Sequence, residues 1–396
     1  MLYTRDVLAE LKKALPKEEF IIITGARQTG KTSLLIILKD FLEKRGESCH
    51  YFNLENPDFL NLLNKHPFEI FELIPRSKAK QVVFIDEVQY LDNPSNFLKL
   101  LFDEKRDKIK IIASGSSSFY IDKKFKDSLA GRKILFEVYP LNFNEFLIFK
   151  EQKKLLKQKN FFLSIYEKQK LLELWREYLT YGGYPRIVLA EEEDVKKIML
   201  GEIASSYIKK DVADAGIRKT EKYFLLLKIM ADQTGQLVNS QELANTLKVA
   251  HKTVEEYLYV MKKSYQAAFL APFYVNLRKE LTRMPKIYFY DLGLRNFFLG
   301  NYMPIEKRAD KGAYLENIVF REILRREKNI DEIKFWRTQD KKEVDFVVGK
   351  SAFEVKFNSD KIKENKYKKF RETYPEIKLK FLTFGQILKE FYGWES

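Results

Sequence analysis

The stretch that decides the fold is residues 20–32, which read FIIITGARQTGKT. Residues 20–24 are typical of a short buried strand, and residues 31–45 have the apolar periodicity of a helix. Between them, residues 25–32 fit the pattern G-x-x-x-x-G-K-[ST], whose glycines let backbone N–H groups curl around phosphate oxygens. The start of the following helix adds partial positive charge. The stretch therefore predicts a phosphate-binding loop between a strand and a helix.

This loop supplies the candidate nucleotide-binding residues. Lys31 is expected to neutralise the β and γ phosphates of a nucleotide, and Thr32 to ligate Mg²⁺. The expected cofactors are therefore ATP and Mg²⁺. The predicted cofactor-binding residues are Gly25, Ala26, Arg27, Gln28, Thr29, Gly30, Lys31 and Thr32.

A second apolar stretch, residues 82–87, reads VVFIDE and ends in two carboxylates. Open α/β sheets bind ligands beyond the carboxyl ends of their strands. Asp86 is expected to hold Mg²⁺ through water, together with Thr32, and Glu87 to orient and deprotonate the attacking water. The alternative is an acidic strand end that only caps a turn.

Two further residues are candidates for catalysis beside Lys31 and Glu87. Ser114 ends the next apolar strand and is expected between the first and third strands, near the γ-phosphate. Arg132 precedes the fifth strand and is a candidate for stabilising transition-state charge, in cis or from a neighbouring subunit. The alternative for Arg132 is a surface salt bridge. The chain has no N-K-x-D motif of the kind that specifies guanine, which favours ATP over GTP.

The first 150 residues alternate strands with helices. The strands are expected at residues 20–24, 50–54, 81–85, 109–113 and 134–138. Such alternation predicts the α/β class, with a parallel sheet covered by helices on both faces.

The motifs together resemble the AAA+-type ATPases that are widespread in archaea and bacteria and carry a C-terminal domain of unknown function. The resemblance rests on GARQTGKT, VVFIDEVQ, SGSSS and AGRKILFEVYPLNFNEF. Three later stretches, YGGYPRIV, YIKKDV and PKIYFYDLGLRNFFLG, are also similar to that group, which assigns them no chemistry. The resemblance covers essentially the whole chain and implies a homo-oligomer, because AAA+ sites usually lie at subunit borders.

The middle of the chain has the pattern of a winged helix. A helix is expected from Asn239, with Ser240 as its N-cap, and a second over residues 251–263. Residues 265–275 would form the wing. Such a second helix can enter the major groove of DNA. Winged helices also serve as protein-contact modules, and the acidic pair at 255 and 256 favours a protein partner slightly.

The C-terminal segment brings carboxylates and a lysine together. A two-residue turn at 349–350 would place Asp345 opposite Glu354, with Lys356 on the same face and Glu316 able to join from the preceding helix. The pattern resembles the PD-(D/E)XK nucleases, in which carboxylates bind Mg²⁺ for phosphodiester hydrolysis. The alternatives are a fold that survives as a scaffold, and a lysine that relieves the repulsion without metal.

The expected architecture is therefore an α/β P-loop AAA+ core with a parallel sheet, a helical lid, a winged helix and a PD-(D/E)XK-like α/β C-terminal domain. The expected boundaries are 1–150, 151–215, 216–285 and 286–396.

Composition limits the class of protein. One cysteine, Cys49, excludes a disulfide framework, and three scattered histidines argue against a zinc site. No apolar run approaches the roughly 20 residues that span a bilayer, so a cytoplasmic protein without membrane contact is expected. The formal charge of +15 favours an anionic partner such as DNA, with a generally lysine-rich surface as an equal alternative.

The leading functional hypothesis is a Mg²⁺-dependent ATPase whose nucleotide state controls a C-terminal module directed at nucleic acid or protein. One alternative is an ATP-gated, Mg²⁺-dependent DNA endonuclease. Another is a nucleotide-dependent switch or assembly scaffold without enzymatic activity.

Overall fold

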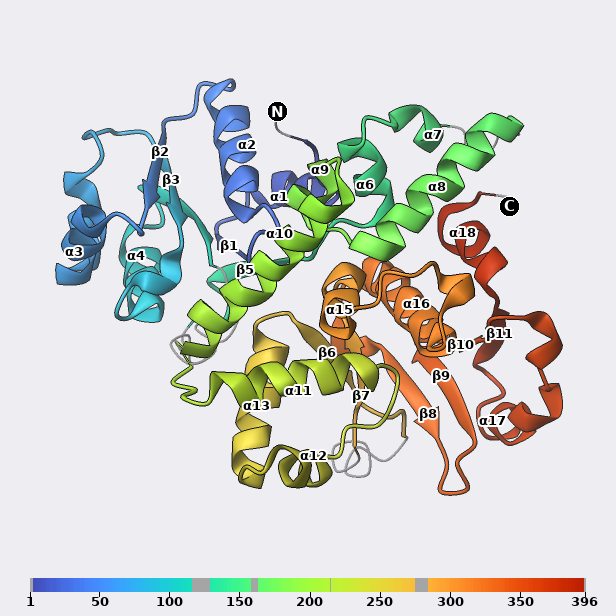
Figure 1. Cartoon of the computed structure of the whole chain (residues 1–396). Coiled ribbons are helices and arrows are strands. Elements are labelled where there is room, and N and C mark those ends of the chain that lie inside the picture. Colours follow the sequence, from blue (N-terminus) through green and yellow to red (C-terminus); the bar gives the residue numbers. More distant parts are fainter. Residues whose placement is uncertain (1–2, 116–128, 158–162, 214, 275–283, 395–396) are drawn as a thin grey trace. The chain divides into compact units, whose positions relative to one another are not determined.

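The computed structural model describes residues 3–115, 129–157, 163–213, 215–274 and 284–394 (Figure 1). The chain separates into two compact units. The first comprises Met1–Leu141 with Lys263–Tyr265, and the second comprises Asn142–Lys262 and Gln266–Ser396. The three segments expected to form the lid, the winged helix and the nuclease-like domain fall almost entirely within the second unit. The division of the second unit into these three domains stays a prediction.

A five-stranded sheet forms the middle of the first unit. Its strands pair in the order β2-β3-β4-β1-β5, and every pair is parallel, which confirms the expected α/β class. All residues of β1, β3 and β4 are buried, as expected for central strands covered on both faces. The strands are β1 (Phe20–Gly25), β2 (Cys49–Asn53), β3 (Gln81–Asp86), β4 (Ile109–Ser114) and β5 (Lys133–Val138).

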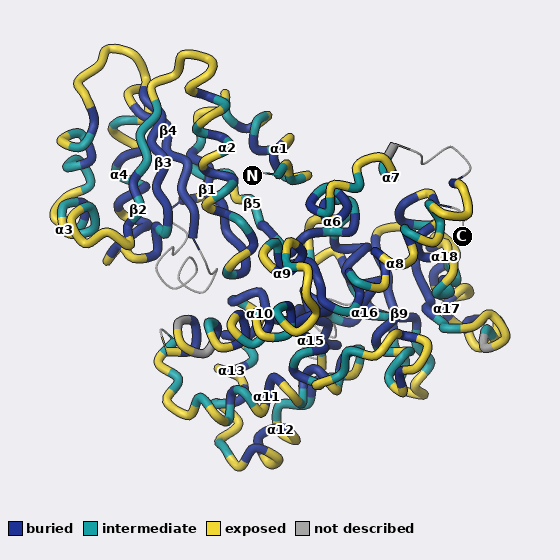
Figure 2. Tube along the Cα trace, turned by 45° about the horizontal axis from the view of Figure 1, so that its top comes forward, coloured by how far each residue is buried: buried dark blue, intermediate teal, exposed yellow. Residues whose placement is uncertain are grey.

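Helices cover both faces of this sheet, and Figure 2 shows the buried strands between them. Ile21 and Ile23 of β1 belong to the core that α1 and α2 cover, whereas Phe20 and Ile22 belong to the core under α3 and α4. This split follows from the period of two in a strand. The helices are α1 (Val7–Ala14), α2 (Lys31–Glu43), α3 (Pro57–Lys65) and α4 (Pro94–Lys105), with short turns η1 (Pro67–Glu72) and η2 (Val88–Tyr90).

The second unit begins with a helical region. Its helices are α6 (Phe143–Phe149), α7 (Lys153–Lys157), α8 (Ile165–Tyr181), α9 (Pro185–Leu189), α10 (Glu193–Ser206) and the π-helical η3 (Tyr207–Val212). Aromatic side chains join this region to the C-terminal helix, because the ring of Phe143 contacts those of Trp175 and Tyr392. No helix in the described residues combines the length and the hydropathy that a membrane span needs.

Three helices and a two-stranded antiparallel sheet follow, in the order expected of a winged helix. They are α11 (Thr220–Asp232), α12 (Ser240–Leu247), α13 (His251–Lys263), β6 (Ala267–Leu270) and β7 (Lys286–Phe289). The N-cap of α12 is Asn239 and not the predicted Ser240, because the Asn239 side chain accepts hydrogen bonds from the N–H groups of Gln241 and Glu242. The expected wing, residues 265–275, ends at a residue outside those described. The identification as a winged helix stays a prediction.

A four-stranded mixed sheet completes the second unit, in the order β11-β10-β9-β8. Val348 pairs with Ser351 in the β9–β10 hairpin, which confirms the predicted two-residue turn. Strand β11 pairs parallel to β10. The elements are α15 (Leu292–Leu299), η4 (Ile305–Lys307), α16 (Lys311–Glu327), η5 (Ile330–Glu332), β8 (Lys334–Arg337), β9 (Glu343–Val348), β10 (Ser351–Val355), η6 (Ser359–Lys361), η7 (Glu364–Tyr367), α17 (Lys368–Thr373), β11 (Lys378–Leu382) and α18 (Phe384–Tyr392).

Asp291, at the start of α15, joins two of the stretches to which the resemblance assigns no chemistry. Its buried carboxylate accepts hydrogen bonds from the N–H groups of Gly183, at 2.8 Å, and Leu294, at 2.9 Å. Nη1 of Arg321 lies 3.6 Å from the same carboxylate. A Cβ on Gly293 would lie 2.0 Å from the carbonyl oxygen of Tyr181, so the backbones meet too closely for any side chain. These stretches are therefore accounted for by packing.

Replacing Asp291 by alanine is expected to destabilise the second unit by about 3 kcal/mol or more, since it removes a helix cap and leaves Arg321 buried without its carboxylate. The chain's three tryptophans, Trp175, Trp336 and Trp394, all lie in this unit. Urea unfolding followed by tryptophan fluorescence therefore measures the effect. The exposed Asp331 serves as control, and Asp331→Ala should shift the transition little. Equal urea midpoints for Asp291→Ala and Asp331→Ala would contradict the structural role given to Asp291.

Candidate nucleotide-binding site

The loop between β1 and α2 has the backbone shape that curls around phosphate. Gly25 has a φ of 142°, and a Cβ there would lie 2.1 Å from the carbonyl oxygen of Val138, so only glycine fits. Gly30, with a φ of 91°, is the N-cap of α2. The Thr29 hydroxyl closes the loop by donating to the carbonyl oxygen of Ala26, at 2.8 Å. The N-terminus of α2 is thus held at the carboxyl end of β1.

Lys31 lies across this loop. Its side chain is buried, and Nζ donates to the carbonyl oxygens of Gly25, at 3.0 Å, and Ala26, at 2.7 Å. An ammonium that is hydrogen-bonded to neutral carbonyls is stabilised further when a phosphate oxygen replaces them, because a hydrogen bond between two charged groups is stronger. The structure thus places Lys31 where the sequence predicts it.

Asp86, at the end of β3, is the centre of a group of hydroxyls. Its Oδ2 accepts from the hydroxyls of Thr32, at 2.7 Å, and Tyr51, at 2.8 Å, and its Oδ1 accepts from Ser114. Burial, and then the hydrogen bond to Asp86, raise the pKa of Tyr51 well above its usual range. The structure thus brings together three predicted residues. Tyr51 was missed, and the only signal for it is its place on the strand beside β3.

Glu87 follows directly and adopts an unusual backbone conformation. Its φ of 59° and ψ of 46° are left-handed, which is uncommon for a residue other than glycine and typical of functional sites. Its N–H donates to the Ser114 hydroxyl, at 3.3 Å, and its carboxylate accepts a hydrogen bond from the Gln89 side chain. Ser114 therefore contacts both acidic residues at once.

Arg5 is a further residue that the motifs do not indicate. Its guanidinium donates to the carbonyl oxygens of Thr29 and Tyr139, both at 2.8 Å. The phosphate loop is thereby tied to the residue after β5. No pattern around Arg5 in the sequence reveals this contact, which depends on the tertiary fold.

Arg132 does not lie beside the phosphate loop of its own chain. Its carbonyl oxygen accepts from the N–H of Phe20, at 2.9 Å, so it lies at the beginning of β1, whereas the phosphate loop follows the end of that strand. Five residues of strand separate the two by about 16 Å. The Arg132 side chain instead pairs with Asp103, Nε to Oδ1 at 2.6 Å, which is the alternative that the sequence left open.

The residues at this site fit Mg²⁺. The Thr32 hydroxyl and the Asp86 carboxylate are oxygen donors only 2.7 Å apart, directly beside the loop that would hold phosphates. Oxygen ligands, one or two from the protein and the rest from phosphate and water, are what Mg²⁺ prefers. The phosphate loop, Lys31 and the Thr32–Asp86 pair together have the composition of a nucleoside-triphosphate site.

The AAA domain family matches residues 17–147, which include every residue of this site except Arg5. This part of the chain is an AAA domain. Two domains of unknown function match the rest, DUF8612 over residues 172–303 and DUF4143 over residues 311–387. The expected relationship to AAA+ ATPases with a C-terminal domain of unknown function is thus confirmed.

Relatives of this architecture occur in bacteria and archaea. An uncharacterized protein of Haemophilus influenzae is 29% identical over 93% of this chain and 92% of its own length. Uncharacterized protein MJ1544 of Methanocaldococcus jannaschii is also 29% identical, over 95% of this chain and 83% of its own length. A solved structure, AMPPCP-bound DnaA from Aquifex aeolicus, aligns at 21% identity over 64% of this chain and 86% of that one, with a TM-score of 0.30. So low a TM-score supports no argument.

Outside the AAA domain, the predicted C-terminal residues do come together, but around a lysine that the sequence analysis missed. Nζ of the buried Lys286, on β7, lies 2.6 Å from Glu343, 3.7 Å from Glu316 and 3.9 Å from Asp345. Lys286 lies in the DUF8612 segment and the carboxylates in the DUF4143 segment, so the cluster joins the two.

A second lysine completes this cluster. Lys356 contacts Glu354, whose Oε1 also accepts from the Tyr367 hydroxyl at 2.6 Å. Asp345 Oδ2 accepts from the N–H of Val355, at 2.8 Å, which places Asp345 and Glu354 on neighbouring strands as predicted. Among the described residues, no group of three or more acidic, histidine or cysteine side chains stands so that it could hold a metal ion. Two lysines, Lys286 and Lys356, thus lie against these carboxylates, and the choice between the metal account and the lysine account stays a prediction.

The cluster should make stability depend on pH. Burial, and then the charge of Asp345, raise the pKa of Glu316 from its ordinary 4.5 to about 8. A carboxyl whose pKa is raised on folding contributes stability that is complete below pH 4.5 and is lost as pH rises through about 8.

Relative to Glu316→Gln, which stays neutral, the wild type should therefore lose stability between pH 5 and 8, by on the order of 1 kcal/mol per pH unit. Urea unfolding followed by tryptophan fluorescence at several pH values measures this difference. A difference that stays constant across this range would show that Glu316 is ionised in the folded protein.

Proposed function

We propose that the chain is a Mg²⁺-dependent ATPase whose nucleotide state controls the second unit. The observation that carries the proposal is the contact between the Thr32 hydroxyl and the buried Asp86 carboxylate, 2.7 Å apart, beside the buried Lys31. A hydroxyl and a carboxylate paired in this way suit the Mg²⁺ ion that accompanies the phosphates of a nucleotide. The AAA domain match supports the same function.

In the proposed mechanism, Lys31 exchanges its two loop carbonyls for phosphate oxygens, and the N–H groups at the start of α2 hold the rest of the phosphate chain. Thr32 and Asp86 would hold Mg²⁺, which neutralises charge on the transferring phosphate. The Thr32 hydroxyl would then turn from Asp86 toward the metal.

Glu87 would act on the attacking water. The Gln89 amide now contacts its carboxylate, so this amide must move aside or share the carboxylate when water arrives. Ser114 bonds both to Asp86 and to the N–H of Glu87, and therefore couples the position of the water-activating residue to the metal-binding one. This coupling provides a route by which loss of the γ-phosphate alters the ends of β3 and β4.

Changes at Lys31 and Glu87 should separate binding from hydrolysis. Lys31→Ala should weaken ATP binding at least about tenfold, because the phosphates lose a charge-assisted contact. Glu87→Gln should keep binding and slow turnover by about 10² to 10⁴, because an amide cannot accept the proton. Glu104→Gln, at an exposed position on α4, is the matched control and should leave turnover unchanged. Phosphate release and calorimetric titration measure the two effects, and normal turnover by Glu87→Gln would overturn the assigned base.

We further propose that the protein assembles into a homo-oligomer in which Arg132 acts on a neighbouring subunit's nucleotide. Arg132 lies at the opposite end of the sheet from the phosphate loop of its own chain, and its side chain is 30% exposed. An arginine so placed is available to an adjacent AAA domain once its pair with Asp103 opens.

Mixing subunits tests this role directly. Arg132→Ala and Lys31→Ala proteins should each be nearly inactive alone. A mixture should recover part of the turnover, because some interfaces then combine an intact arginine with an intact phosphate loop. Light scattering gives the size of the assembly. A stable monomer with full ATPase activity would contradict both the assembly and the role of Arg132.

The alternatives have distinct readouts. A DNA endonuclease would nick supercoiled DNA with Mg²⁺ and lose this activity in Lys356→Ala, whereas a scaffold would bind ATP without turnover. The geometry does not favour the endonuclease over the ATPase, because the ammonium of Lys286 already lies among three of the C-terminal carboxylates. No contact between the described residues favours the scaffold over the ATPase. DNA and protein both remain candidate partners of the controlled module.

A further inference from the structure

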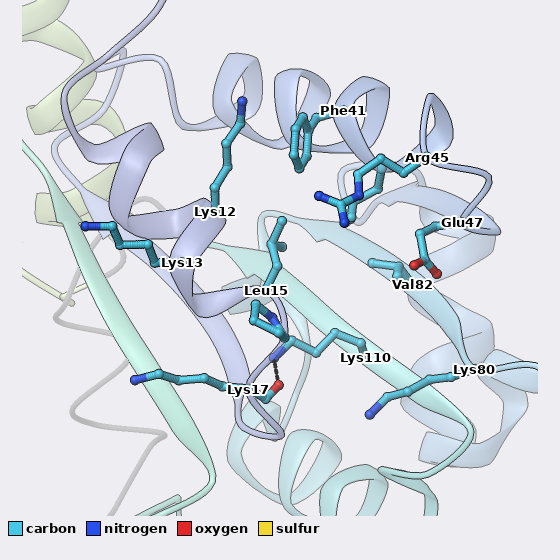
Figure 3. Close-up of a pocket in the computed structure, with 12 residues that line it drawn as sticks. Lys12, Lys13, Leu15, Lys17, Phe41, Arg45, Glu47, Lys80, Val82 and Lys110 are labelled. Atoms are coloured by element: carbon cyan, nitrogen blue, oxygen red, sulfur yellow. Dashed lines mark hydrogen bonds between the residues drawn. The ribbon is translucent and has the colours of Figure 1, made fainter.

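A basic pocket opens in the first unit at the end of the sheet away from the phosphate loop (Figure 3). Its volume is about 580 Å³, which is within the usual range of roughly 300 to 1,000 Å³ for small-molecule sites. Val82 and Lys110, near the starts of β3 and β4, lie on its wall, whereas Asp86 and Ser114 end the same strands. Four residues of strand separate the two sites by about 13 Å.

Basic side chains surround the pocket. They come from α1, from the segment after α1, from the segment after α2, from the residue before β3 and from β4, and Figure 3 draws them, with the side chains of Lys13 and Lys17 extending away from Arg45 and Lys80. They are Lys12, Lys13, Lys17, Arg45, Lys80 and Lys110, with Glu47 as the acidic side chain. Within the described part of the chain, none of the six forms an ion pair with a carboxylate. The pocket therefore holds a concentrated positive charge.

Lys110 carries this charge into the interior. It lies on a fully buried strand, is itself only 4% exposed, and donates through Nζ to the carbonyl oxygen of Lys17 at 2.6 Å and to that of Glu19. Burial, and then the charge of Lys80, lower its pKa to about 8, so it stays mostly protonated at neutral pH. A buried cation held by carbonyls and facing other cations is stabilised when an anion enters.

The shape of the pocket favours a small anion over a DNA backbone. The basic residues line one pocket, whereas contacts to a duplex are spread along a face or a helix. Apolar side chains form part of the wall, and the ring of Phe41 lies between two cations, with Lys12 Nζ 4.0 Å and Arg45 Cζ 5.5 Å from its centroid. Several cations in a limited volume suit a ligand with more than one phosphate group.

We propose that this pocket is a second anion site, separate from the nucleotide site, for a small molecule that carries two or more phosphate groups. The proposal goes beyond the ATPase function and does not depend on it. The ligand's phosphates contact Lys12, Arg45 and Lys80 at the mouth, and Lys110 at the base.

The test uses the full chain with Lys31→Ala, which disables the phosphate loop, and inorganic tripolyphosphate as the probe. Binding is measured by calorimetry without Mg²⁺ and at about 150 mM salt, because salt at this concentration screens nonspecific attraction to the basic surface. Tripolyphosphate should bind at one site. Adding Lys12→Ala and Lys80→Ala should weaken this binding at least about tenfold, since two charge-assisted contacts are lost.

The control is Lys65→Ala in the same background, because Lys65 is exposed on α3 and lies outside the pocket. It should leave tripolyphosphate binding unchanged, and circular dichroism checks that all variants are folded. Equal binding by the pocket and control variants, or no binding by either, would overturn the proposal. Binding of a short DNA duplex through Lys12 and Lys80, without tripolyphosphate binding, would also overturn it and identify a nucleic-acid surface.

Discussion

The AAA domain is organised around one buried carboxylate. Asp86 ends β3 and accepts hydrogen bonds from hydroxyls on α2, β2 and β4. A buried anion is costly unless it is well bonded, and here each bond comes from a different element of the sheet layer. The relative positions of the phosphate loop, Glu87 and the strand end at Ser114 depend on these bonds. A ligand that breaks one of these hydrogen bonds therefore also affects the other hydroxyls that are bonded to Asp86.

Much of the AAA domain could be predicted because its signals are local. The strand, loop and helix of residues 20–32 follow one another along the chain, and the wholly buried strands β1, β3 and β4 are recognisable as apolar runs. The contacts that sequence reasoning missed are between distant segments. Arg5 reaches Thr29 and Tyr139, and nothing near position 5 signals either contact. The sequence left Arg132 open between a role in cis, a role in trans and a surface salt bridge, because the motif identifies a residue type but not the end of the sheet at which it lies.

In the C-terminal cluster, too, contacts that are local along the chain could be predicted and contacts between distant segments could not. The hairpin register of β9 and β10 follows from a turn of two residues, so the approach of Asp345 and Glu354 could be calculated. Lys286 belongs to another sheet, 59 positions before Asp345 along the chain, and no periodicity relates the two. Its ammonium supplies a covalently attached counter-ion to three carboxylates. One ammonium is therefore shared among three acidic side chains.

The pairing of β7 with β6 determines where the chain can be divided. Strand β7 begins at residue 286, the predicted start of the nuclease-like domain, yet it pairs with residues 267–270, and Asp291 bonds to Gly183. A fragment beginning at residue 286 would lose one strand of a two-stranded sheet and deprive the buried Asp291 carboxylate of one of its two backbone donors, the N–H of Gly183. The segment from residue 286 onward thus shares its packing with the residues before it. A shortened chain that keeps these contacts must therefore begin before Gly183, so the helical region and the C-terminal segment are best handled as one piece in the laboratory.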